Sequence, residues 1–348
     1  MRTPRALLGL AGAGILGVGA CSDAPAALPM SFDGLVLDTL IEIGSESGAP
    51  FETFQGIWDI EADADGHLAL LDLGGPVVHV FDMDGGHVSS LDAAGLEEGQ
   101  LDRPSGIAWS EPGKLMVWDP GSSWVSTFDV GASIEFEDRW RAFAFGETGF
   151  CASGDRTFIS FWLNDQVVHE WGPEGPVQSF GVAPRVVGAD MLGPELREIA
   201  IEELTPSALL CTSDGVLDVS FVQSLVRLHD LNGEEVWSRN LEDFNPIVVY
   251  SDDGIGLGRG FDAVDGSHLL RSVVPWGASM VLVQHEIRLR EIPEEGDVEV
   301  FESRLLRLAD GGEVARTRDL PLVLGAEGRR LYLVSEEPYS RVTVVEVR

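Results

Sequence analysis

The chain has 348 residues, 58 acidic side chains against 23 basic ones, and a formal net charge of −35. This charge argues against DNA, RNA and anionic lipid headgroups as partners, because the chain has too few cations to neutralise their phosphates. The length is enough for one large β domain or for two domains of ordinary size.

Residues 1–20 are expected to be a signal peptide. Arg2 and Arg5 precede an apolar run of 15 residues, which is too short to cross a bilayer as an ordinary helix. The run ends in VGAC, which resembles the lipobox of bacterial lipoproteins. The resemblance predicts that Cys21 is lipidated and begins the mature chain; ordinary cleavage just before it is the alternative. The next segment, residues 21–33, is expected to be a flexible tether.

From residue 34 to residue 348 the chain is expected to form one domain of repeated β-strands. Residues 56–92 contain four short strand-like segments separated by turns rich in Gly and Asp. Residues 106–138 repeat this order, and the two units begin 50 residues apart, at Gly56 and Gly106. A repeat of about 40–50 residues with four strands in each unit is typical of a β-propeller.

Weaker repeats follow over 150–180, 208–240, 276–319 and 325–347. The last one stops after its third strand, whereas residues 34–44 form a strand-like segment with no other evident partner. A propeller must close its ring, and a strand from the N-terminus can complete the last blade. The sequence therefore predicts an all-β fold, a six-bladed β-propeller whose last blade is closed by the N-terminal strand.

One segment breaks the β pattern. Residues 193–204 begin with Gly-Pro-Glu, which suits a first helical turn, and the apolar residues that follow are spaced as on a helix: Leu196, Ile199, Ala200 and Leu204. We expect a short helical insertion between the third and fourth blades. Its apolar face is expected to pack on the propeller rather than to bind a partner.

Two Asp-x-Asp-Gly stretches, at 63–66 and 82–85, could belong to calcium loops or to turns. An EF-hand loop needs oxygen ligands at positions 1, 3 and 5, Gly at position 6 and Glu at position 12. Here Gly arrives at the fourth position and a strand-like segment follows at once. The spacing therefore favours tight hairpin turns, in which Asp bonds to nearby backbone and Gly takes a positive φ.

The first two repeats resemble the NHL-type propeller repeat. In that repeat a Gly-Ile start is followed by Asp-x-x-Gly, by an apolar strand ending in Asp, and by Val-x-Val-Phe-Asp. The matching residues are Gly56, Ile57, Gly66, Leu68, Asp72, Val78, Val80, Phe81, Asp82 and Gly85, then Gly106, Ile107, Ala108, Gly113, Val117, Asp119, Val125, Phe128 and Asp129. The resemblance implies the fold and a place among six-bladed lipoproteins of bacterial envelopes; it does not specify an activity.

A resemblance to lactonase-like propeller hydrolases would imply a divalent cation in the central channel. Candidate carboxylates lie near strand starts, at Asp59, Glu61, Asp252 and Asp253. They do not match that family's ligand set residue by residue, so no metal residue is assigned and no cofactor is predicted. Ca or Zn enters only under this alternative.

Histidines and tryptophans are explained better by repeat position than by chemistry. Three histidines fall in or near the third strand of a repeat, and the tryptophans considered as a carbohydrate platform fall at strand positions: His79, His169 and His229, then Trp58, Trp109, Trp118 and Trp171. No Gly-x-Ser-x-Gly motif supports nucleophilic catalysis. Blade packing is therefore the favoured role of these residues, and no catalytic residue is assigned.

Beyond the lipobox, the chain has two cysteines, Cys151 and Cys211. In an exported protein they could form a disulfide, or they could be free and buried, and the sequence leaves both open.

The favoured function is a monomeric, lipid-anchored propeller of the bacterial cell envelope, on the periplasmic or outer-membrane face. It would bind a protein or small molecule through its loops or channel mouth, without enzymatic activity, and contact the membrane by its lipid anchor alone. The alternative is a metal-dependent hydrolase or lyase.

Overall fold

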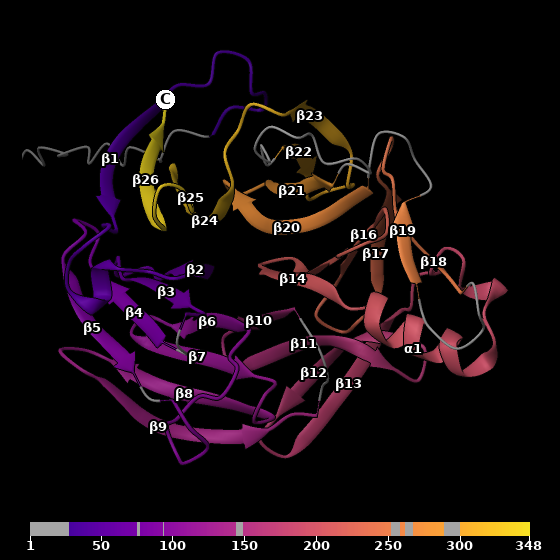
Figure 1. Ribbon diagram of the computed structural model, residues 1–348, viewed down its shortest axis with the longest axis horizontal. Helices are drawn as coiled ribbons and strands as arrows, with labels where there is room; N and C mark the ends of the chain where they lie inside the picture. Colours follow the sequence, from indigo (N-terminus) through magenta and orange to yellow (C-terminus); the bar gives the residue numbers. More distant parts are fainter. Residues whose placement is uncertain are drawn as a thin grey trace, which may run out of the picture.

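The computed structural model describes residues 28–74, 77–92, 94–143, 149–251, 258–261, 267–288 and 300–348. Strands dominate these residues, and they build a ring of six four-stranded sheets (Figure 1). The expected signal peptide, the lipidation site Cys21 and the candidate ligands Asp252 and Asp253 lie outside the described residues.

The first three blades follow the predicted units. Blade one contains β2 (Ile57–Ala62), β3 (Leu68–Asp72), β4 (Val77–Phe81) and β5 (His87–Asp92). Blade two contains β6 (Gly106–Glu111), β7 (Lys114–Asp119), β8 (Trp124–Val130) and β9 (Ile134–Arg141). Blade three contains β10 (Phe150–Ser153), β11 (Arg156–Leu163), β12 (Gln166–Gly172) and β13 (Gly175–Val182).

The remaining three blades complete the ring. Blade four contains β14 (Ser207–Thr212), β15 (Gly215–Ser220), β16 (Leu225–His229) and β17 (Glu235–Asn240). Blade five contains β20 (Ser267–Trp276), β21 (Met280–Arg288), β22 (Phe301–Arg307) and β23 (Glu313–Thr317). Blade six contains β24 (Val323–Glu327), β25 (Arg330–Ser335) and β26 (Arg341–Val347), and β1 (Leu37–Ile43) is its fourth strand.

The two ends of the chain close the ring. Strand β1 pairs antiparallel with β26 from Leu37 opposite Val347 to Ile43 opposite Val342. The innermost strands β2, β6, β10, β14, β20 and β24 contact one another in this order, and β24 contacts β2. Both the six-bladed architecture and its closure by the N-terminal strand are thereby confirmed.

Blade five differs from its predicted bounds. The prediction began this unit at Trp276, but that residue ends the first strand, β20, which runs from Ser267. The strand lacks the Gly-Ile start of the first two repeats, and it joins β21 through a short turn at Gly277 rather than an Asp-x-Asp-Gly turn. Its buried and half-buried residues nevertheless alternate along much of its length, which is the pattern of a half-buried strand.

The last residues of the expected tether contact the propeller. Leu28 is buried with Trp276 in the hydrophobic cluster between blades five and six. The Trp276 indole N–H donates to the carbonyl of Pro29, and Phe32 packs edge-on against the same ring, 5.9 Å between centroids. Residues 28–33 therefore lie against the propeller, because Leu28 and Phe32 pack on Trp276.

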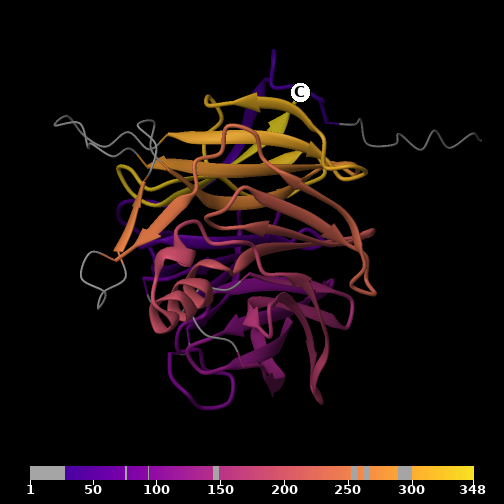
Figure 2. The same cartoon turned by 90° about the vertical axis from the view of Figure 1, so that its right-hand side faces the viewer.

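Within the described residues, inserted segments interrupt the ring order at three places. A short 3-10 helix, η1 (Pro50–Glu52), precedes blade one. Between blades three and four lie η2 (Ala189–Met191) and the predicted helix α1 (Pro194–Leu204), and between blades four and five lies a separate hairpin of β18 (Ile247–Tyr250) and β19 (Gly258–Phe261). Figure 2 shows α1 and this hairpin together on one side of the disc.

We call these inserted segments the inserted layer: η2, α1 and β18–β19. A small hydrophobic core joins η2, α1 and β18. Ala200 and Leu204 of α1 are buried against Val249 of β18 and Val222 of blade four. The helix was expected to pack on the propeller, and these two residues do so. Ile199 was assigned to the same face but is 42% exposed.

Candidate functional site

The first Asp-x-Asp-Gly stretch is a hairpin turn held by its own carboxylate. Asp63 is 3% exposed, and its Oδ1 accepts the backbone N–H groups of Asp65 and His67 at 3.0 and 2.7 Å. Its Oδ2 accepts from Gly113 in the next blade at 3.1 Å and lies 2.9 Å from His67 Nδ1. Burial alone would raise the pKa of Asp63, but these bonds lower it below its ordinary value. The Asp63 carboxylate therefore has a structural role, since it holds its own turn and bonds to the next blade.

The second stretch repeats the turn without the burial. Asp82 is exposed, and its Oδ1 accepts from Asp84 and Gly86 at 2.9 and 2.7 Å. Gly66 and Gly85 have φ values of +90° and +80°, which favour glycine. The turn interpretation of both stretches agrees with this geometry.

The two turns form a matched pair for mutation. We expect Asp63→Ala to lower the free energy of unfolding by about 2 kcal/mol, because it removes the acceptor of half-buried N–H groups in two blades. Asp82→Ala, at an exposed copy of the same turn, should cost less than about 1 kcal/mol. Urea unfolding midpoints compare the two variants, and equal losses would contradict a role for Asp63 in joining blades.

The channel carboxylates Asp59 and Glu61 lie on β2, the innermost strand of blade one. Asp59 Oδ2 accepts the backbone N–H of Ile107 on β6 at 2.9 Å, and its Oδ1 accepts from Ile60. Burial raises the pKa of Asp59 to about 6 in spite of these bonds. Burial and the neighbouring Asp59 carboxylate raise the pKa of Glu61 well above its ordinary value. Ionising both groups therefore costs the fold free energy.

This cost predicts a pH dependence. A carboxyl with a raised pKa stays protonated in the folded state after it has ionised in the unfolded chain, so stability falls as the pH rises above its ordinary pKa. We expect Glu61→Gln to be more stable than the wild type at pH 8, by on the order of 1 kcal/mol, and to lose this advantage near pH 4. Thermal melts across this range measure the difference, and a pH-independent difference would contradict the assignment.

Within the residues that the structure describes, no three His, Cys, Asp or Glu side chains form a group that could hold a metal ion. Asp59 and Glu61 are close enough to interact, and Glu327 on β24 also has a pKa raised by burial. Asp59 already accepts two backbone N–H groups. The described part of the channel therefore assigns no ligand set.

Two of the three third-strand histidines hold equivalent positions in different blades. His79 Nδ1 lies 2.7 Å from Ser90 Oγ in blade one, and His169 Nδ1 lies 2.8 Å from Ser179 Oγ in blade three. In each case the serine is on the adjoining fourth strand. Repeat position therefore accounts for both. His229 is at the end of β16 instead, 3.9 Å from Asp218 Oδ2.

The indole N–H groups join the ring together. Five of them donate to a backbone carbonyl of another blade or connecting segment: Trp58 to Ser105, Trp109 to Glu61, Trp171 to Arg141, Trp237 to Leu308, and Trp276 to Pro29. Trp118 and Trp171 are buried. These contacts agree with the packing role inferred for the tryptophans.

A buried polar cluster at the seam of blades four and five was not predicted. His268, His285, Glu302 and Arg304 are each at most 3% exposed. Arg304 donates to Glu302 and to the carbonyl of Glu242. Although burial opposes it, His268 and the charge of Arg304 lower the pKa of Glu302 to about 2. The cluster is placed by three strands of one blade, so no short motif could have revealed it.

Among the residues that the structure describes, neither ring nitrogen of His285 has a hydrogen-bond partner. Burial, with the charges of His268 and Arg304, lowers its pKa to about 3. It is therefore neutral at neutral pH.

Cys151 and Cys211 form a disulfide, with Cα atoms 5.6 Å apart. Cys151 is on β10 and Cys211 on β14, so the bond joins the innermost strands of blades three and four.

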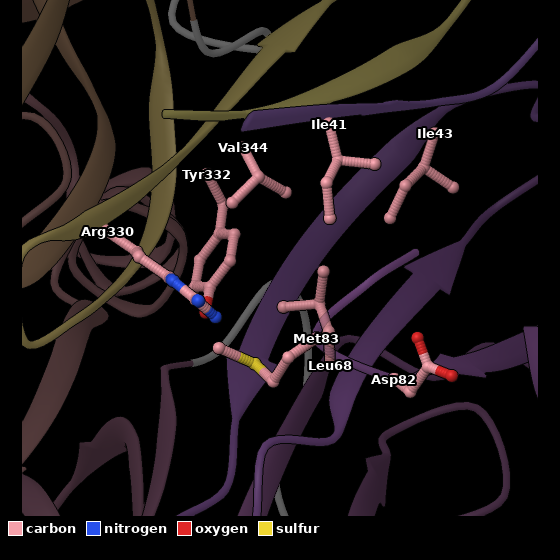
Figure 3. A pocket seen from close by; sticks show the side chains of 8 residues that line it. All are labelled: Ile41, Ile43, Leu68, Asp82, Met83, Arg330, Tyr332 and Val344. Atoms are coloured by element: carbon pink, nitrogen blue, oxygen red, sulfur yellow. The ribbon is translucent and has the colours of Figure 1, made fainter. Parts of the chain in front are cut away.

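Figure 3 shows a crevice between blades six and one. It is lined mainly by apolar side chains, with Arg330 and Tyr332 on one side and Asp82 on the other: Ile41, Ile43, Leu68, Asp82, Met83, Arg330, Tyr332 and Val344. The crevice leaves no interior room for a water molecule. It is therefore a packing seam rather than a ligand site.

A second cleft lies where α1 meets β11. It has a volume of about 290 Å³ and is lined by Trp162, Leu192, Pro194, Arg197, Glu198 and Ile201. Met191, which precedes the lining residue Leu192, is 88% exposed. The helix was predicted from its spacing, but the cleft was missed, because Trp162 lies on β11 of blade three, far from α1 in the sequence.

No protein-family model matches the chain, and no curated protein matches its sequence. Solved structures do match it. A "Putative exported protein" of Bacteroides fragilis has a TM-score of 0.59 and 10% identity, over 92% of this chain and 99% of that one. A member of the DUF4221 family from Bacteroides vulgatus has a TM-score of 0.57 and 8% identity, over 90% and 98%. At these identities the likeness concerns the fold: this chain is a six-bladed β-propeller similar along its ring to those two proteins.

Proposed function

We propose that this chain is exported to the bacterial cell envelope, is held there by a lipid on Cys21, and acts as a non-enzymatic binding module. The inserted layer is its binding surface for a partner protein. The observation that carries the proposal is that the inserted layer combines exposed apolar side chains with an open cleft. Met191 is 88% exposed and Tyr250 46%, although both belong to the layer that α1 and β18 build.

The rigidity of the ring supports this role. The blades are joined by backbone, tryptophan and disulfide contacts, and α1 is held by its own buried residues Ala200 and Leu204. A rigid scaffold that carries an exposed insertion is an arrangement suited to recognition, because little conformational entropy is lost on binding. The likeness to an exported protein supports the envelope location. Among the described residues, no helix is long and apolar enough to cross a membrane.

The NHL-type interpretation of the repeats belongs to the same proposal. Asp72 and Asp119 hold equivalent positions at the ends of the second strands of blades one and two. Asp72 accepts the N–H groups of Gln55 and Gly56, and Asp119 accepts those of Asp102 and Arg103. The two equivalent carboxylates each hold the segment that precedes the first strand of their blade. This equivalence supports a common repeat.

Photo-crosslinking in producing cells tests the binding surface. A photoreactive residue at Met191 should capture partner proteins that the same residue at Leu40 does not. Leu40 is a matched control because it is 44% exposed on β1, outside the inserted layer. Identical adducts from both sites, or none from Met191, would argue against the inserted layer as the binding surface.

Metal analysis of the dialysed protein tests the non-enzymatic part. Stoichiometric Ca or Zn that survives dialysis would favour the channel hydrolase or lyase instead.

The anchor is tested separately. We expect Cys21→Ser to move the protein from the membrane fraction to the soluble fraction, because the lipidated side chain is lost. Ser22→Ala, which keeps the cysteine, should stay with the membrane. A Cys21→Ser variant that remains in the membrane fraction would contradict lipid anchoring at this residue.

A further inference from the structure

We propose that the cleft between α1 and β11 binds a basic amphipathic segment of a partner protein, which inserts one apolar side chain beside Trp162. This inference rests on the proposed binding function and names the chemistry of the partner. It is carried by the shape of the cleft, by its apolar rim and by its charge.

The open shape of the cleft favours one side chain of a larger partner over an enclosed small molecule, because small-molecule sites bury most of the surface of their ligand. The cleft has a volume of about 290 Å³ and is open to solvent, with Trp162, Leu192 and Ile201 as its apolar lining. A large aliphatic or aromatic side chain fits this space and would bury apolar area against these three residues.

The rim adds an exposed apolar side chain to the cleft. Met191 precedes the lining residue Leu192 and is 88% exposed. A segment with apolar residues on one face can therefore contact Met191 while it anchors in the cleft, as amphipathic helices do in grooves.

The charge of the surface selects a basic segment. Helix α1 carries exposed Glu195, Glu198 and Glu202. Its one cation, Arg197, lies 3.5 Å from Asp190, which also pairs with Arg185. The helix therefore presents uncompensated negative charge around an apolar cleft, and Lys or Arg side chains of a partner would complement it.

Other occupants fit less well. A second copy of the chain would bring another acidic surface, since each chain carries a formal charge of −35. An anionic membrane would be repelled for the same reason. The cleft is also preformed, because Ala200 and Leu204 anchor the helix in a core with Val222 and Val249. Binding therefore needs little ordering of α1.

The test uses a defined probe and the full mature protein. A fluorescent amphipathic helix of about 18 leucines and lysines is titrated with the protein in about 150 mM NaCl, which screens long-range attraction. A peptide with glutamate in place of each lysine is the control. We expect saturable binding of the lysine peptide and none of the glutamate peptide. Hydrogen exchange should show protection of α1 and β11.

Charge and apolar variants locate the site. Glu198→Arg should weaken binding about tenfold, whereas Asp214→Arg, the same charge change on an exposed turn of blade four, should change it less than about twofold. Met191→Ser should also weaken binding about tenfold. Val236→Ser, at a residue 53% exposed on β17, is its control and should have no effect.

Each outcome is decisive. Equal weakening by Glu198→Arg and Asp214→Arg, or protection outside α1 and β11, would show non-specific attraction and overturn the inference. All variants are exposed, and matching melting temperatures exclude loss of fold. If Met191 crosslinks a partner in cells but the lysine peptide does not bind, the partner chemistry is wrong while the binding function stands. If Met191 captures nothing, the binding function itself fails.

Discussion

Replacing Cys151 and Cys211 by serine should lower the free energy of unfolding by about 2–4 kcal/mol. The bond closes a loop with a sequence separation of 60 residues, so its loss frees a large stretch of the unfolded chain. It also removes the covalent link between β10 and β14, the innermost strands of two adjacent blades. Denaturant midpoints of the oxidised wild type and the double serine variant measure the loss.

Reduction supplies the control for this result. Dithiothreitol should destabilise the wild type by a similar amount and leave the double serine variant unchanged. A wild type whose midpoint does not respond to the reductant would show that the bond contributes nothing to stability.

Arg304→Ala should cost about 3–5 kcal/mol, because it leaves Glu302 as a buried charge without its closest cation. Arg304 is fully buried, donates to Glu302, and also reaches the carbonyl of Glu242 across the seam to blade four. The loss should be largest at neutral pH. Glu302 has a lowered pKa, so its contribution is present above the ordinary pKa of a glutamate and disappears as the pH falls toward about 2.

A paired replacement separates charge from packing. Arg304→Met combined with Glu302→Leu removes both charges and keeps apolar volume, so it should be much closer to the wild type than Arg304→Ala. Unfolding in urea at several pH values compares the three proteins. If the double variant is as unstable as the single one, the loss is one of packing and the ion pair is not its cause.

Much of the architecture could be predicted from the sequence, because the residues that define each repeat lie close together in the chain. Asp63 and Gly66, or Asp82 and Gly85, set a tight turn within a few residues, and the apolar segments beside them alternate as strands do. The truncated last repeat then required β1 to close blade six. The predicted start of blade five was wrong, because β20 lacks both the Gly-Ile start and the acidic turn.

Much less of the candidate site could be predicted from the sequence. The sequence predicted α1 and its apolar residues. In the structure, Ile199 lies outward, and Ile201 lines a cleft together with Trp162 of blade three. Likewise, His268 lies on the first strand of blade five, whereas Glu302 and Arg304 lie on the third. His268 is far from the other two in the sequence, so no short motif joins the three residues. Such groups depend on which strands become neighbours.

The sequence by itself determined the repeat, the turns, the closure and the inserted helix of this protein, because these follow from contacts between residues close in the chain or from a count of strands. Only the tertiary structure decided that Cys151 meets Cys211, that Asp63 serves the next blade, and that Trp162 and α1 line one open cleft. The physical reason is that each of these depends on the position of one blade against another blade or against α1, and no local pattern encodes that distance.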